Sequence, residues 1–109
     1  MREIESWDQV DDIFTEGGGS GYDWQTEELI AFTLSDGTRV YAHYADGGCS
    51  CTAPRLSPIK SQDLSWTTDL DSVYRAVREG VRSLSMDAGN RTRALSRLAS
   101  AVRRERARK

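Results

Sequence analysis

The stretch that decides the fold is residues 29–44, which reads LIAFTLSDGTRVYAHY. Two runs rich in β-branched and aromatic residues flank the dipeptide Asp36-Gly37. Asp-Gly between two such runs is the strongest short-range signal for a β-hairpin, because a type I′ turn needs positive φ at both central residues. The sequence therefore predicts two antiparallel strands joined by a tight turn.

The loop length also predicts a register for this hairpin. A two-residue loop would place Phe32 opposite Tyr41 and Ile30 opposite His43 on one face. The other face would then carry the remaining apolar side chains, which are Leu29, Ala31, Val40, Ala42 and Tyr44. Because both faces are largely apolar, we expect the hairpin to be covered on both sides.

Two helices are predicted after the hairpin. The segment Thr68-Asp69-Leu70-Asp71 resembles a capping box, and a helix over 69–85 should follow it. Its apolar residues fall on one narrow stripe of a helical wheel, with an arginine stripe beside it. A second helix over 90–106 is indicated by Leu95, Leu98 and Val102, and its basic C-terminus suits the negative end of the helix dipole.

The N-terminal part carries a weaker pattern. Trp7, Val10 and Phe14 recur at helical spacing, and Ser6 is a suitable N-cap, so the sequence predicts one short helix. The glycine-rich run over 16–21 should then act as a connector that breaks regular structure.

Together these signals predict an α+β fold. A chain of 109 residues suffices for one domain. We expect a small antiparallel sheet to pack against the first helix, with the basic helix following it. Three parts are expected: a short helix and connector over 1–20, an α+β core over 21–85, and a basic helical extension over 86–109.

The net charge of −2 hides a strong asymmetry. Residues 1–72 hold 14 acidic and 4 basic residues, whereas residues 73–109 hold 3 acidic and 11 basic residues. The basic part either neutralises phosphates or forms a solvated face that pairs with the acidic half. The candidate partner-binding residues are Arg75, Arg78, Arg82, Arg97, Arg103, Arg104 and Arg106.

One compact motif has the residue types of a metal or redox site. Cys49 and Cys51 follow His43 closely, and Asp46 lies between His43 and Cys49, so these four side chains could supply the four ligands of a zinc site. The C-x-C spacing is shorter than usual for zinc, and a second cysteine pair is lacking. The favoured interpretation is therefore two thiols that pack a tight loop, with no metal and no cofactor. Metal binding and redox chemistry remain the minor alternatives.

Nothing in the sequence indicates an active site. His43 is the single histidine, and no nucleophile elbow is present, so no catalytic triad and no catalytic residue can be assigned. No apolar run is long enough to span a bilayer, and the N-terminus is acidic where a signal peptide would be basic. We therefore expect a non-enzymatic protein of the cytoplasm, which is the host cytoplasm if a phage encodes it.

A pattern of short motifs resembles a group of small proteins encoded by actinobacterial phages. In this chain the pattern comprises Gly21-Tyr22-Asp23, the strand 29–34, Asp36-Gly37, the strand 40–44, Gly48-Cys49-Ser50-Cys51 with Pro54, and a helix after Thr67-Thr68. The resemblance covers about residues 21–85. The chain departs from the pattern at Pro54-Arg55-Leu56, where the group often has Pro-Phe-Glu.

The resemblance implies a setting and no activity. Small phage proteins of this size often bind and block host machinery, including defence systems such as CRISPR effectors. The leading hypothesis is therefore a protein that binds a host or phage macromolecule, with an inhibitory, anti-CRISPR-like role as its sharper form. The alternative is a nucleic-acid-binding protein that uses the arginine-rich C-terminus. No membrane partner is expected, and the sequence leaves the oligomeric state open.

Overall fold

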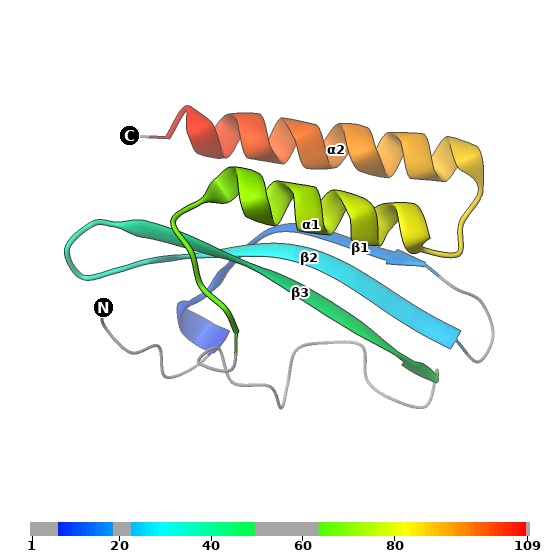
Figure 1. Cartoon of the computed structure of the whole chain (residues 1–109), viewed down its shortest axis with the longest axis horizontal. Coiled ribbons are helices and arrows are strands. Elements are labelled where there is room, and N and C mark those ends of the chain that lie inside the picture. Colours follow the sequence, from blue (N-terminus) through cyan, green and yellow to red (C-terminus); the bar gives the residue numbers. More distant parts are fainter. Residues whose placement is uncertain (1–6, 19–22, 50–63, 109) are drawn as a thin grey trace.

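The computed structural model describes residues 7–18, 23–49 and 64–108. Three strands are followed by two helices along the chain (Figure 1). The elements are the 3₁₀ turn η1 (Trp7–Gln9), the strands β1 (Asp11–Gly18), β2 (Asp23–Thr33) and β3 (Arg39–Cys49), and the helices α1 (Leu70–Ser83) and α2 (Ala88–Arg106). The predicted α+β class is confirmed.

The strands form one antiparallel sheet in the order β1-β2-β3. Helices α1 and α2 run side by side and cover one face of this sheet (Figure 1). Helix α1 packs on β2 and β3, while α2 contacts α1 and β1. The N-terminal strand and the C-terminal helix therefore belong to the same two-layer arrangement as the central hairpin.

The hairpin exists, but its loop differs from the prediction. The backbone N–H of Leu34 donates to the carbonyl of Thr38 (2.7 Å), and that of Gly37 donates to the carbonyl of Leu34 (2.9 Å). Gly37 has φ +93°, and no described non-glycine residue has positive φ. The loop is thus a three-residue connection, in which a type I turn is followed by a glycine in the left-handed region.

This extra loop residue makes the predicted register wrong by one position. Phe32 pairs with Val40 rather than with Tyr41, and Ile30 pairs with Ala42 rather than with His43. Because successive side chains of a strand point to opposite faces, the shift turns every side chain of β3 to the other face relative to β2. Tyr41 therefore shares a face with Ala31, and Tyr44 shares a face with Ile30.

The predicted helix at residues 6–14 is also wrong. Only a single 3₁₀ turn forms at Trp7–Gln9, and the chain then enters β1. Gly17 and Gly18 complete this strand instead of starting a connector, while the rest of the glycine-rich run, at 19–21, lies outside the described residues. Phe14 is buried against the helices.

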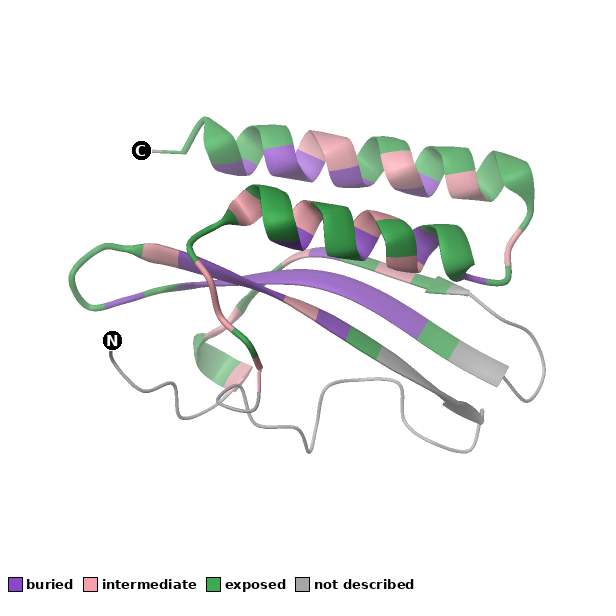
Figure 2. Ribbon diagram, viewed as in Figure 1, coloured by how far each residue is buried: buried purple, intermediate pink, exposed green. Residues whose placement is uncertain are grey.

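The main core lies between the sheet and the helices (Figure 2). It combines strand residues with the stripes of both helices, namely Phe14, Leu29, Ala31, Tyr41, Val73, Val77, Val81, Ala94, Leu98, Ala101 and Val102. Burying this many apolar side chains on one side of a three-stranded sheet supplies most of the driving force for folding.

The opposite sheet face is covered as well, as predicted for the hairpin. One cluster there consists of Phe32, Leu34 and Val40. The Trp66 ring packs against it, with its centroid 6.3 Å from that of the Phe32 ring. A neighbouring cluster of Ile30, Ala42 and Tyr44 is packed by Trp7, Val10, Leu64 and Trp66.

Both helices begin at aspartate caps. The Asp69 side chain accepts a hydrogen bond from the backbone N–H of Ser72 (3.3 Å), which confirms a capped helix close to the predicted 69–85. Asp87 caps α2 in the same way through the backbone N–H of Asn90 (2.7 Å), so this helix begins two residues before the predicted position 90.

Candidate functional site

The seven arginines singled out in the sequence all lie on the helical layer. Arg75, Arg78 and Arg82 belong to α1, and the other four, Arg97, Arg103, Arg104 and Arg106, belong to α2. Six of the side chains are exposed, and that of Arg78 is half-buried. Exposed and buried residues alternate along both helices (Figure 2).

Three of these arginines form ion pairs. Arg106 pairs with Asp71 of α1, Arg97 pairs with Glu16 of β1, and Arg82 lies 3.5 Å from Glu79 on its own helix. The sequence interpretation of basic residues that pair with the acidic half therefore holds for Arg97 and Arg106. The pairs of Arg82 and Arg106 are exposed on both sides, and exposed pairs contribute little to stability.

The remaining four arginines have no carboxylate partner among the described residues: Arg75, Arg78, Arg103 and Arg104. The guanidinium of Arg78 lies over the Tyr74 ring, 5.4 Å from its centroid. Arg103 donates to the Ser100 hydroxyl (3.1 Å). These cations are held on the two helices and lack a carboxylate partner in the described part of the chain. The name arginine face is used for these four residues together: Arg75, Arg78, Arg103 and Arg104.

A second cluster of charges, centred on Glu105, was not found by sequence reasoning. Glu105 of α2 is buried, and its Oε1 accepts from Arg39 Nε (2.6 Å) and from the Tyr41 hydroxyl (3.4 Å). Arg39 also donates through Nη1 to Asp11 of β1 (2.6 Å). Arg39 therefore ties both outer strands of the sheet to the last turns of α2.

The electrostatics of this network follow from burial and pairing. Burial by itself would lower the pKa of Arg39, but its hydrogen bonds with Glu105 and Asp11 outweigh that effect and raise the pKa. Burial also raises the pKa of Tyr41, and the negative charge of Glu105 adds to this shift. Both side chains accordingly remain in their usual protonation states around neutral pH, which suits a structural clamp.

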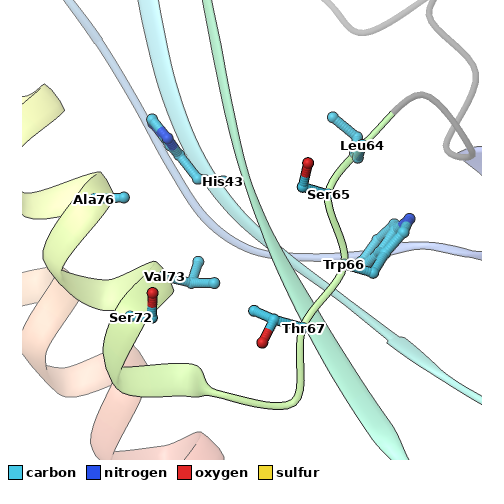
Figure 3. Close-up of a pocket in the computed structure, with 8 residues that line it drawn as sticks. All are labelled: His43, Leu64, Ser65, Trp66, Thr67, Ser72, Val73 and Ala76. Carbon is cyan, nitrogen blue, oxygen red and sulfur yellow. The ribbon is translucent and has the colours of Figure 1, made fainter.

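A third polar group lies between the sheet and α1. His43 Nε2 is 2.5 Å from Glu27 Oε1, and the Glu27 side chain is only 11% exposed. His43 also lines a pocket of about 590 Å3 with hydroxyl groups from Ser65, Thr67 and Ser72 (Figure 3). No hydrogen bond joins His43 to a hydroxyl in the described part of the chain. The arrangement is a contact between an imidazole and a carboxylate beside a pocket.

Gly80 of α1 makes room for this pair. A Cβ atom at position 80 would lie 1.8 Å from Glu27 Oε1. We expect Gly80→Ala to lower the free energy of unfolding by roughly 1–2 kcal/mol, because it displaces the buried Glu27 carboxylate from His43. In the background of Glu27→Ala the same substitution should raise stability by about 0.5–1 kcal/mol, since alanine is the better helix former. Urea denaturation of the wild type, the two single variants and the double variant measures this reversal of sign. A Gly80→Ala effect of the same sign in both backgrounds would contradict the contact between Glu27 and position 80.

The cysteine motif receives no structural test. Cys51 and the side chains of Cys49 and Asp46 lie outside what the structure describes. His43, the remaining candidate ligand, points its Nε2 at Glu27. Within the described residues no group of three or more His, Cys, Asp and Glu side chains is arranged to hold a metal ion.

Comparison of the chain with protein-family models, with curated proteins and with solved structures finds no match. In the described part of the chain, neither helix has the combination of length and apolar character that crossing a membrane requires.

Proposed function

We propose that this protein is a non-enzymatic binding protein, which attaches through its arginine face to an acidic surface of a host or phage protein. The observation that carries the proposal is the contrast between the two sets of arginines on the helices. One set is used by the fold in ion pairs, whereas Arg75, Arg78, Arg103 and Arg104 are not paired with any described carboxylate.

The choice of arginine over lysine supports a protein partner. Residues 69–108 contain ten arginines and no lysine. Arginine is enriched in protein–protein interfaces and lysine is depleted, because a guanidinium binds carboxylates in bidentate fashion and is more weakly hydrated. Stacking of Arg78 on Tyr74 lowers the entropy that this side chain loses on binding. A pre-positioned arginine beside a tyrosine has the character of a binding hot spot.

Nucleic acid is the second candidate, and the charge of the helical layer favours it. The ten arginines of residues 69–108 face only five acidic residues in the same segment. The net charge of −2 for the whole chain opposes long-range attraction to phosphates, and for that reason we rank this candidate second.

The test uses an actinobacterial lysate, as the phage resemblance indicates, and a variant in which all four residues of the arginine face are changed to glutamine. We expect the wild type to retain a protein that this variant loses, with at least a tenfold fall in affinity once the partner is purified. The matched control changes Arg82, Arg97 and Arg106 to glutamine, and it should retain the partner because these residues already have carboxylates.

Nuclease treatment and salt separate the two candidates. Retention that survives nuclease supports the protein partner. The alternative result is binding of duplex or single-stranded DNA with a sub-micromolar Kd at about 150 mM salt, with an affinity that falls steeply as the salt concentration rises. This result would identify nucleic acid, rather than a protein, as the partner. Equal retention by the wild type and the arginine-face variant would contradict both candidates for this surface.

A further inference from the structure

The outer edge of β3 is paired at one residue only within the described structure. The backbone N–H of Tyr41 donates to the Thr67 carbonyl (2.7 Å), and the N–H of Thr67 donates back to the Tyr41 carbonyl (2.9 Å). The backbone groups of Tyr41 therefore point away from β2. Since alternate residues of a strand point their backbone groups to the same side, those of His43 and Ala45 also point outward.

The chain does not continue this pairing beyond Thr67. No backbone hydrogen bond in the described part of the chain reaches the outer side of His43 or Ala45. The segment before Thr67 leaves the edge because Leu64 and Trp66 pack against the opposite face of the sheet. A strand position next to β3 thus begins at Thr67 and stops after one rung.

Space for a further strand exists at this position. The pocket of about 590 Å3 lies between β3, residues 64–67 and the first turns of α1, with His43 on the β3 side (Figure 3). Helix α1 lines it with the short side chains of Ser72, Val73 and Ala76. Its lining therefore combines hydroxyl groups and an imidazole with the short side chains of α1.

We propose that this edge of β3 binds an extended peptide segment of a partner protein, which adds a strand beside His43 and Ala45. Only a polypeptide in extended conformation offers alternating N–H and C=O groups at the spacing that these two residues present. The existing rung at Tyr41 and Thr67 fixes the distance at which the added backbone lies from β3. This edge is separate from the arginine face, and either site can fail without the other.

The free protein provides the first readout. In amide hydrogen exchange followed by NMR, Tyr41 and Thr67 should exchange slowly, whereas the amides of His43 and Ala45 should exchange rapidly. Slow exchange of both His43 and Ala45 in the free monomer would overturn the proposal, because another part of the chain would then occupy the edge. Protection that appears only as the protein concentration rises, together with a dimer in sedimentation, would assign the edge to a second copy instead.

The binding test uses a displayed library of random heptapeptides as the probe. The tightest peptide should slow amide exchange at His43 and Ala45, and a version with N-methylated backbone amides should lose at least tenfold in affinity. Failure to select a peptide, or selection of peptides that leave both amides unprotected, would overturn the proposal.

Two pairs of variants of the full chain sharpen this test. Ala45→Pro removes an outward N–H from an edge strand, where proline is tolerated, and should weaken the selected peptide at least tenfold, while Ala45→Ser should leave affinity within twofold. Ala76→Gln fills the pocket from an exposed helix position, and should also weaken binding at least tenfold, whereas Ser96→Gln on α2 should not. Ala76→Gln and Ser96→Gln leave the residues of β3 unchanged. Unchanged peptide binding by Ala76→Gln would therefore overturn the proposal whether or not Ala45→Pro folds.

Discussion

Val77→Asp is expected to unfold the protein. Val77 is fully buried at the centre of the helix–sheet core, with Val73 and Val81 one turn away on either side. A carboxylate at this position would lose its hydration without gaining a partner, at a cost of roughly 3 kcal/mol or more. Since small domains are stabilised by only about 5–15 kcal/mol, the variant should lose its cooperative thermal transition, which circular dichroism measures.

The matched control places the same residue on the same helix. Ala76 precedes Val77 but is exposed, so Ala76→Asp should keep a cooperative melt close to that of the wild type. A Val77→Asp protein that melts like this control would show that the α1 stripe does not form the core.

Glu105→Gln should produce the second large loss. The substitution keeps the shape of the side chain but removes the charge that faces Arg39, whose side chain is only 12% exposed. Breaking a buried ion pair leaves the remaining charge poorly compensated. Arg39 keeps the Thr33 hydroxyl and the carboxylate of Asp11, which is 58% exposed. We expect a decrease of about 2–3 kcal/mol in the free energy of unfolding, measured by urea denaturation.

An exposed pair on the same helix provides the comparison. Arg106→Gln breaks the contact with Asp71, where both side chains are about half exposed, and should change stability by no more than about 0.5 kcal/mol. Equal effects of Glu105→Gln and Arg106→Gln would contradict a clamp that depends on burial.

The helices could be predicted because their signals are local. Asp69 caps α1 through a residue three positions later, and the buried Val73, Val77 and Val81 repeat at the spacing of one helical turn. Such features are set by residues within a few positions of one another, so the sequence carries them without knowledge of the rest of the fold.

The strand β1 could not be predicted in this way. Trp7, Val10 and Phe14 satisfy a helical period, yet β1 begins at Asp11. Pairing with β2, along with the burial of Phe14 against the helices, decides the conformation. These partners are distant in sequence, so tertiary structure overrides the local pattern.

The His43–Glu27 pair was missed because of one residue in a loop. In the observed register His43 pairs with Leu29. Glu27 lies two residues before Leu29 in β2 and therefore on the same face as His43. A two-residue loop would have placed His43 opposite Ile30. The sequence signal, Asp-Gly, suits either loop, and only the φ values of Asp36 and Gly37 separate them.

The clamp at Glu105 also has a consequence for folding kinetics. The meander of three strands and the pair of helices each join neighbours along the chain, and such local contacts form early. Arg39 and Glu105 are 66 residues apart, so their contact closes a long loop and should form after the transition state. Weakening it would then mainly accelerate unfolding and leave the folding rate nearly unchanged. The lifetime of the native state thus depends on the last turns of α2, far from the residues that initiate the fold.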